Sequence, residues 1–103
     1  MKGTRLDQIH KRIERIKAEL VAIDEMRPGS LTEQLKKPDA QRSYYQLSYT
    51  HGGKSRTEHV PRDLVGEARR QIINYKRFKA LIAEWIDLSI EQCRLKMQAG
   101  SET

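Results

Sequence analysis

The segment spanning residues 43–60 constrains the fold most, because it alone has the composition and spacing of a β-hairpin. Tyr45, Leu47 and Tyr49 alternate with polar residues, which is the pattern of a strand with one buried face. Gly52-Gly53 then suits a two-residue turn in which both residues have positive φ angles. The sequence therefore predicts a hairpin with helical patterns on either side of it.

The Gly-Gly turn also sets a register, which sorts the side chains onto two faces. The register pairs His51 with Lys54, Tyr49 with Arg56, Leu47 with Glu58, Tyr45 with Val60, Ser48 with Thr57 and Gln46 with His59. An isolated two-stranded hairpin is marginal in water, so we expect the apolar face to pack on helices. The other face, which includes Tyr44, then turns outward and is available for contacts.

The first helical pattern occupies residues 4–27. Thr4 and Asp7 have the spacing of a capping box at its start. The apolar residues that follow alternate at spacings of three and four: Leu6, Ile9, Ile13, Ile16, Leu20 and Ile23. This narrow stripe predicts a coiled-coil seam, and Pro28-Gly29 predicts its end.

Residues 28–42 are expected to connect this helix to the hairpin. Ser30 and Glu33 have capping-box spacing, which predicts a short helix running to about Leu35. Residues 36–42 combine turn chemistry with positive charge and have no apolar period, so they predict an exposed basic loop.

A second long helix is predicted over residues 61–98, because Pro61 suits a first helical turn and no further proline follows. Its apolar arc is too wide for one partner helix, so we expect a homodimer or another protein to cover part of it. The residues assigned to that interface are Leu81, Leu88, Leu95, Ile86 and Ile90. Glu84, Asp87 and Glu91 are expected to face solvent.

The fold class predicted from these patterns is mainly α, in a single domain covering residues 1–103. The predicted order is a long helix, a short helix and basic loop, a β-hairpin and a long helix. The long helices are expected to pair antiparallel as a coiled coil. The same seams would serve within one chain or between two chains, and the sequence leaves this choice open.

The net charge of +6 is concentrated in residues 36–79, which hold eleven Lys or Arg residues and four acids. A localised basic surface is the usual footprint of nucleic-acid binding, and a β-ribbon can enter a major groove, so we expect DNA rather than RNA as partner. The candidate contact residues are Lys36, Lys37, Arg42, Gln46, Ser48, Lys54, Arg56, Thr57, His59, Arg62, Arg69, Arg70, Lys76 and Arg77.

The sequence contains little that would indicate catalysis, metal binding or a membrane protein. Cys93 is the single cysteine, and His10, His51 and His59 are not spaced with acids or cysteine as metal ligands or as an acid-base pair. We therefore expect a non-catalytic protein with no metal and no cofactor. No signal peptide and no membrane-spanning run is apparent, which predicts a cytoplasmic protein without membrane contact.

An ordered series of short motifs also resembles a known family. The motifs are Arg27-Pro28-Gly29-Ser30-Leu31, Tyr44-Tyr45-Gln46-Leu47-Ser48-Tyr49-Thr50, Gly53-Lys54-Ser55-Arg56-Thr57-Glu58 with Val60-Pro61, and Asn74-Tyr75-Lys76-Arg77-Phe78-Lys79. They resemble small bacterial and archaeal proteins of unknown function that are often encoded with transposases and other mobile-element genes. Many of those relatives carry a cysteine-rich insertion where this chain has only residues 36–42.

Two functions remain after this reading of the sequence. The first is a nucleic-acid-binding accessory protein of a mobile element, which the resemblance and the basic region both favour. The alternative is a protein-interaction or assembly module that acts through the helical seams, for which a mobile-element protein is a possible partner.

Overall fold

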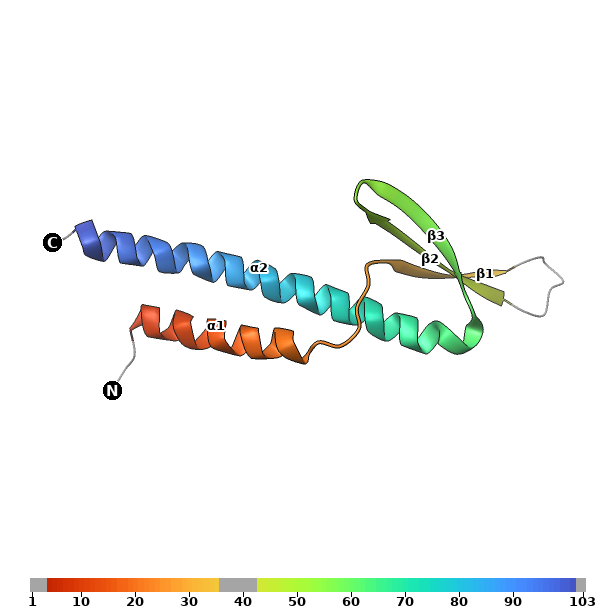
Figure 1. Cartoon of the computed structure of the whole chain (residues 1–103), viewed down its shortest axis with the longest axis horizontal. Helices are drawn as coiled ribbons and strands as arrows, with labels where there is room; N and C mark the ends of the chain where they lie inside the picture. Colours follow the sequence, from red (N-terminus) through yellow and green to blue (C-terminus); the bar gives the residue numbers. More distant parts are fainter. Residues whose placement is uncertain (1–3, 36–42, 102–103) are drawn as a thin grey trace. The chain divides into compact units, whose positions relative to one another are not determined.

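The computed structural model describes residues 4–35 and 43–101 (Figure 1). The elements follow the order α1 (Arg5–Ala22), β1 (Ser30–Leu35), β2 (Ser43–His51), β3 (Lys54–Val60), a 3-10 turn η1 (Arg62–Leu64) and α2 (Val65–Ser101). They form two compact units. The helical unit contains the described residues up to Ile23 and those from Arg77 onward, and the sheet unit contains Asp24–Lys76.

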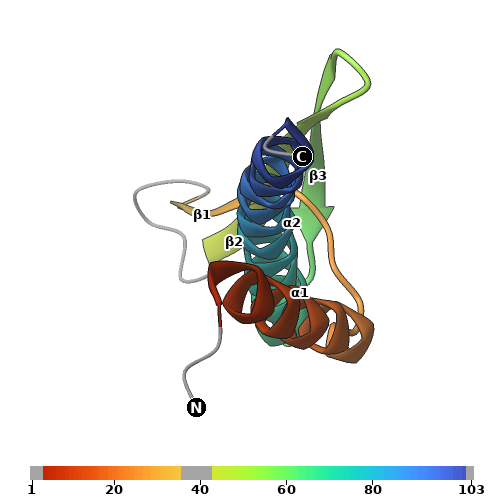
Figure 2. The ribbon, with the colours of Figure 1, turned by 90° about the vertical axis from the view of Figure 1, so that its left-hand side faces the viewer.

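In the helical unit, α1 lies antiparallel to the C-terminal half of α2 (Figures 1 and 2). The capping box at the start of α1 is confirmed, since Thr4 Oγ1 accepts from the Asp7 amide at 3.1 Å and the Thr4 amide donates to Asp7 Oδ2 at 3.2 Å. The buried side chains here are Ile9, Ile13, Ile16 and Leu81. These short apolar rows are the core of the unit.

Three ion pairs join the two helices at intervals of seven residues, about two turns. Arg5 pairs with Glu91 at 2.6 Å, Arg12 with Glu84 at 2.5 Å, and Arg77 with Glu19 at 2.7 Å. Residue numbers rise along α1 as they fall along α2, which fixes the antiparallel direction. Glu84 and Glu91, which were expected to face solvent, keep side chains 41% and 40% exposed and also pair with arginines of α1.

The sheet unit contains a three-stranded antiparallel sheet in the order β1-β2-β3. The predicted hairpin register is confirmed at every pair from Tyr45 with Val60 to His51 with Lys54. Gly52 and Gly53 have φ angles of 61° and 78°, as the two-residue turn requires. Strand β1 pairs with β2 from Ser30 opposite Ser48 to Leu35 opposite Ser43.

The predicted fold class is wrong, because the described residues form two α-helices and a three-stranded antiparallel sheet. The segment predicted as a short helix, Ser30–Leu35, is strand β1. One helical turn is costly to nucleate, whereas an extended segment beside β2 gains a hydrogen bond at alternate residues and places Leu31 toward the core.

Coiled-coil pairing is not shown by the contacts of the described residues either. The fully or nearly fully buried part of the α1 stripe runs only from Ile9 to Ile16, while Leu6, Leu20 and Ile23 are half-buried. A supercoil normally needs a seam sustained over several heptads, and about one heptad is buried here.

The packed face of the sheet lies on the N-terminal part of α2. Leu47 is fully buried, and it clusters with Val60 of β3 and with Val65, Ala68 and Ile72 of α2. Leu31 and Tyr45 pack against this cluster from the side. The expected packing of the apolar hairpin face on a helix is therefore confirmed.

Helix α1 ends at Ala22, earlier than the pattern up to residue 27 predicts. The segment that follows is tied to α2 instead. The Arg27 amide donates to the Gln71 carbonyl at 3.1 Å, and Asn74 Nδ2 donates to the Glu25 carbonyl at 2.8 Å. These bonds replace the helical ones and lead the chain into β1.

Candidate nucleic-acid interface

The outer face of the sheet carries uncharged polar side chains on all three strands. Because side chains alternate along a strand, the observed register places one set together: Ser30, Thr32 and Gln34 of β1, Tyr44, Gln46, Ser48 and Thr50 of β2, and Ser55, Thr57 and His59 of β3. We call these ten residues the polar face. Neither a charged nor an aliphatic side chain belongs to it.

Hydroxyl groups are paired across the polar face. The Ser48 and Thr57 oxygens are 3.4 Å apart, and the Thr50 and Ser55 oxygens are 2.9 Å apart. A hydroxyl donates one hydrogen bond and can accept two, so each pair keeps capacity for a ligand. Farther along the strands, the rings of Tyr44 and His59 lie 6.0 Å apart at an angle of 32°.

A hollow of about 380 Å³ lies over part of this face, at the end of the sheet near the hairpin turn. Five hydroxyl side chains line it, together with the segment that leads into β1 and two residues of the opposite face. Its lining residues are Ser30, Ser48, Thr50, Ser55, Thr57, Pro28, Gly29, Tyr49 and Arg56. The hollow can therefore offer several hydrogen bonds beside one guanidinium group.

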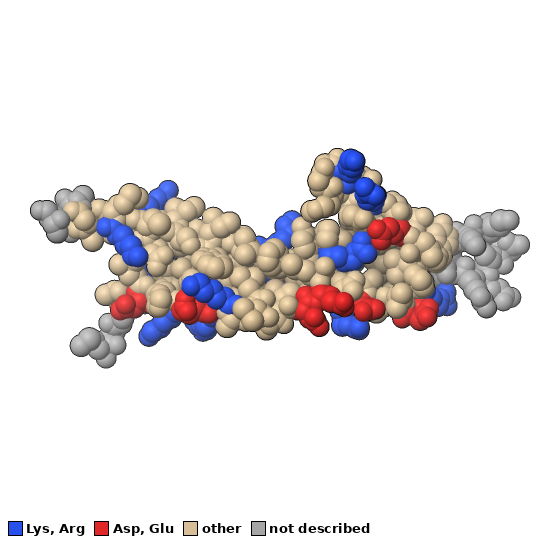
Figure 3. All heavy atoms as spheres, in the orientation of Figure 1, with Lys and Arg blue, Asp and Glu red and all other residues tan. Residues whose placement is uncertain are grey.

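Two cations lie at the hairpin turn. Lys54 and Arg56 are exposed, and both have the parity of the packed face rather than of the polar face. Figure 3 shows Lys and Arg atoms gathered at the tip of the β2–β3 hairpin. The tip thus has cations on one face and hydroxyls on the other.

Three basic residues of α2, Arg69, Arg70 and Lys76, line two separate hollows. Arg69 and Lys76 line a hollow of about 450 Å³ whose wall includes Gly29 and Ser30, which also border the hollow of the polar face. Arg70 lines a different hollow, beside three acids: Asp24, Glu25 and Glu67. Arg69 also lies 6.0 Å from the centre of the Tyr45 ring, and Tyr45 belongs to the packed face, so Arg69 lies on the packed-face side of the sheet. Lys76 lines the same hollow as Arg69, whereas Arg70 lines a hollow with acids.

The remaining predicted contact residues lie elsewhere. Arg77 belongs to the helical unit and is paired with Glu19, and Arg62 lies in η1 with its side chain exposed. Gln46 is half-buried on the polar face, while Ser48, Thr57 and His59 are exposed on it. Lys36, Lys37 and Arg42 lie outside the described residues.

One cation near the sheet is neutralised, and sequence reasoning missed it. Arg27 pairs with Glu58 at 3.3 Å and lies 5.0 Å from the centre of the Tyr49 ring. The Tyr49 hydroxyl donates to Glu58 at 2.9 Å, and this bond, together with the Arg27 guanidinium, lowers the pKa of Glu58. The Arg27–Glu58–Tyr49 cluster supports the sheet and leaves little charge for a ligand.

Sequence reasoning also missed Ser30, Thr50 and Ser55. Thr50 and Ser55 have the same parity as Ser48 and Thr57, so the hairpin register itself could have found them. Ser30 could not be assigned to the polar face from sequence, because residues 30–35 were predicted to form a helix rather than a strand beside β2. The predicted interface residues are placed apart: Leu81 is buried inside the helical unit, Leu88 and Leu95 are half-buried, and Ile86 and Ile90 are exposed.

Within the described ranges, no group of three or more His, Cys, Asp and Glu side chains converges as metal ligands would. No described helix is both long enough and apolar enough to cross a membrane.

Comparison with known proteins gives one match. A search of curated proteins found none similar to this chain, and a search of solved structures found none either. The model of one protein family, described as a domain of unknown function (DUF6788), matches residues 6–70. The match spans α1, the whole sheet and the start of α2. Because it includes more than half of the sequence, the chain belongs to the DUF6788 family.

Proposed function

We propose that this chain is a non-catalytic nucleic-acid-binding accessory protein of a mobile element, and that the polar face of its sheet contacts duplex DNA. The observation that carries the proposal is the hydroxyl-lined hollow of about 380 Å³ with Arg56 at its edge. The motifs shared with proteins encoded beside transposases support the mobile-element setting.

The chemistry of the polar face suits base edges. Hydroxyl and amide groups can donate to acceptors and accept from donors, and both kinds occur in the major groove. Burying uncharged hydroxyls costs less than burying ions, provided that each finds a partner. Arg56 lines the hollow of this face and Lys54 is exposed nearby at the hairpin turn, so both are suited to phosphates, which position a protein on the duplex.

The dimensions of the sheet favour DNA over RNA. Neighbouring strands lie about 4.8 Å apart, so the backbones of three strands span roughly 10 Å. The major groove of B-DNA is about 12 Å wide, whereas the major groove of A-form RNA is deep and too narrow for protein side chains to read. With its polar face toward the base edges, the sheet therefore fits the major groove of DNA better than that of an RNA duplex.

The test is fluorescence anisotropy with a labelled DNA duplex of about two helical turns, and with the matching RNA duplex, over a range of salt concentrations. The double variant K54E/R56E should weaken DNA binding by roughly tenfold or more, and should reduce the magnitude of the salt slope by about 2. The variant K11E/R15E makes the same charge change on exposed residues of α1 and serves as the matched control.

A second variant separates contact with bases from contact with phosphates. Thr50→Val with Thr57→Val removes two hydroxyls, keeps the side-chain shape and suits a strand. We expect it to reduce the preference for a selected duplex over competitor DNA while leaving the salt slope unchanged. Binding that K54E/R56E and K11E/R15E weaken equally would contradict the proposed interface, and so would the absence of DNA binding at low salt.

A protein-interaction module is the second candidate function. The observation that favours it is the exposed apolar row on the C-terminal half of α2, where Ile86, Ile90 and Met97 face outward. Sedimentation of the chain with and without DNA separates the two functions, because a module of this kind gains mass only with a protein.

A further inference from the structure

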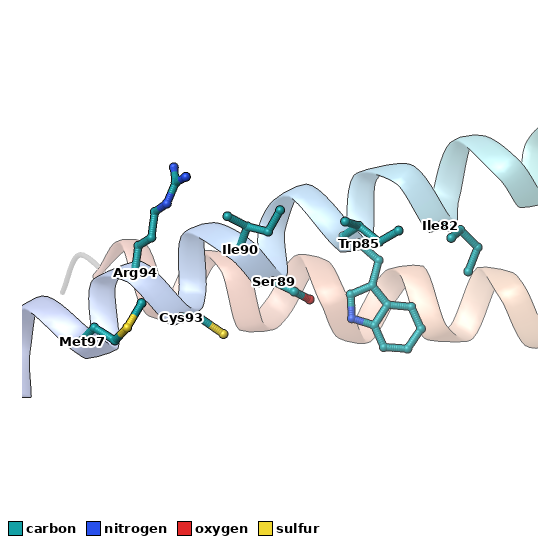
Figure 4. Close-up of a pocket in the computed structure, with 8 residues that line it drawn as sticks. Ile82, Trp85, Ser89, Ile90, Cys93, Arg94 and Met97 are labelled. Atoms are coloured by element: carbon teal, nitrogen blue, oxygen red, sulfur yellow. The ribbon is translucent and has the colours of Figure 1, made fainter.

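The helical unit exposes an apolar row that none of its described residues covers. Ile86, Ile90, Cys93 and Met97 follow one another along α2 at spacings of four, three and four. Ile86 is 55% exposed, Ile90 46% and Met97 66%, and Cys93 is exposed as well. They line a shallow hollow of about 590 Å³, together with Ile82, Trp85, Ser89 and Arg94 (Figure 4).

This row is distinct from the one that packs on α1. At 100° per residue, Leu81, Leu88 and Leu95 lie about half a turn away from Ile90 and Cys93. Leu81 is buried, and Leu88 and Leu95 are half-buried. Helix α1 therefore stabilises one side of α2 and leaves the other side open.

Two charged residues beside the apolar row, Asp87 and Arg94, also lack a partner of opposite charge among the described residues. Glu84 and Glu91 are paired with Arg12 and Arg5 of α1. Asp87 has no ion pair among the described residues, and Arg94 has none either. Asp87 and Arg94 are seven residues apart, so they lie two turns apart along the same edge of the apolar row.

We propose that a second copy of this chain covers the row, with its α2 antiparallel and related by a two-fold axis perpendicular to both helices. Such an axis brings the same edge of each helix together and reverses the direction. Asp87 then meets Arg94 of the second copy, and Arg94 meets Asp87 of the second copy. In the core of the contact, Ile86 lies opposite Met97 of the second copy, and Ile90 opposite Cys93 of the second copy.

Charge complementarity selects this arrangement. In a parallel pair, the edge that holds Asp87 and Arg94 would face the edge that holds Ile82 and Ser89, and both charges would stay unmatched. The antiparallel pair satisfies two Asp–Arg contacts and removes four apolar side chains per copy from water. The proposal is independent of DNA binding, because every residue it uses lies outside the sheet unit.

Sedimentation equilibrium of the full chain, without nucleic acid, tests the pair. We expect wild type to have twice the mass of one chain at about 100 µM. Ile90→Glu should weaken the dimer by roughly a hundredfold or more, because it buries a carboxylate in the contact. Asp87→Arg or Arg94→Asp alone should weaken it roughly tenfold, and the double reversal should restore the wild-type affinity to within about threefold.

A cross-linking test fixes the direction. Ile90→Cys, which keeps Cys93, should form an intermolecular disulfide under mild oxidation, because residue 90 lies opposite residue 93 of the second copy. Wild type and Ile90→Cys with Cys93→Ser should not cross-link. Either of these two forming a disulfide would indicate like residues side by side and would overturn the antiparallel pair. A monomeric wild type, or a double reversal that restores nothing, would overturn it too.

Discussion

The helical unit and the sheet unit differ in the kind of side chain that each leaves exposed to solvent. In the helical unit, three ion pairs join α1 to α2, and the opposite side of α2 exposes an apolar row with Asp87 and Arg94 along one edge. In the sheet unit, Leu47 and Val60 pack under the sheet on α2, and the opposite face of the sheet presents hydroxyl groups with Arg56 beside them.

What each unit leaves exposed indicates the kind of partner it suits. Exposed apolar residues in a row gain free energy when another protein surface covers them. Exposed hydroxyls with cations at the margin gain little from an apolar surface but match a polar, anionic ligand. We therefore propose self-association for the helical unit and DNA contact for the sheet unit.

The largest expected effect would break the sheet unit at the entrance to β1. Gly29 has a φ angle of 149°, and an added Cβ would lie 2.6 Å from Leu47 Cδ1. Leu47 is fully buried and cannot move away cheaply, so Gly29→Ala should cost about 2–4 kcal/mol of unfolding free energy. Urea denaturation followed by circular dichroism measures this cost.

The matched control is Gly66→Ala at the start of α2. An added Cβ there meets only the Arg70 guanidinium at 3.9 Å, and alanine favours a helix, so stability should rise by up to about 1 kcal/mol. Equal effects of the two substitutions would show that the close approach of Gly29 to the sheet core does not limit the fold.

A smaller effect concerns the helical unit and depends on pH. The hydrogen bonds from Arg12 and Arg5 lower the pKa of Glu84 and of Glu91 in the folded chain. A carboxyl group with a lowered pKa adds stability above its unfolded pKa, about 4.3, and loses that contribution as the pH falls through the folded pKa. Glu84→Gln with Glu91→Gln should therefore flatten the decline in Tm between about pH 5 and pH 2.

Thermal melts at several pH values provide the measurement. Glu25→Gln is the control, because Glu25 has no ion pair within the described part of the chain. A pH profile that the double substitution leaves unchanged would mean that the ion pairs do not hold α1 on α2 in solution.

The smallest effect would sharpen the account of the sheet unit. Tyr49→Phe removes the hydroxyl that donates to Glu58, which is the largest cause of the lowered pKa of that carboxyl group. The pKa of Glu58 should rise toward its ordinary value, remaining somewhat low because Arg27 is still beside it. NMR titration of the Glu58 carboxyl carbon measures the shift. Tyr44→Phe, on the polar face, should leave this pKa where it is.

The parts of the fold that follow local rules were predictable from sequence. The Thr4–Asp7 capping box, the Gly52-Gly53 turn and the hairpin register depend on residues close in the chain, and all three are confirmed. The packed face of the hairpin followed from the register, because parity alone assigns Leu47 and Val60 to one side.

Strand β1 was not predictable by the same rules. Ser30 and Glu33 have the spacing of a helix cap, which favours a helix. The strand that forms instead pairs with residues of β2 that lie up to 18 positions away along the chain. The predicted interface residues lie on different sides of α2 for a related reason. A helical repeat shows that Leu81 and Ile90 lie on different sides of α2, but only the position of α1 decides which side is covered.

The sequence by itself determined the hairpin, the two helices and the concentration of positive charge near the middle of the chain, because these depend on local geometry and composition. Tertiary structure alone decided that residues 30–35 complete a sheet, that Arg77 pairs with Glu19, that Arg70 lines a hollow with three acids, and that the Ile90 row stays open. The physical reason is that hydrogen-bond partners, ion pairs and burial are set by neighbours distant in sequence, and no local pattern specifies which neighbours those are.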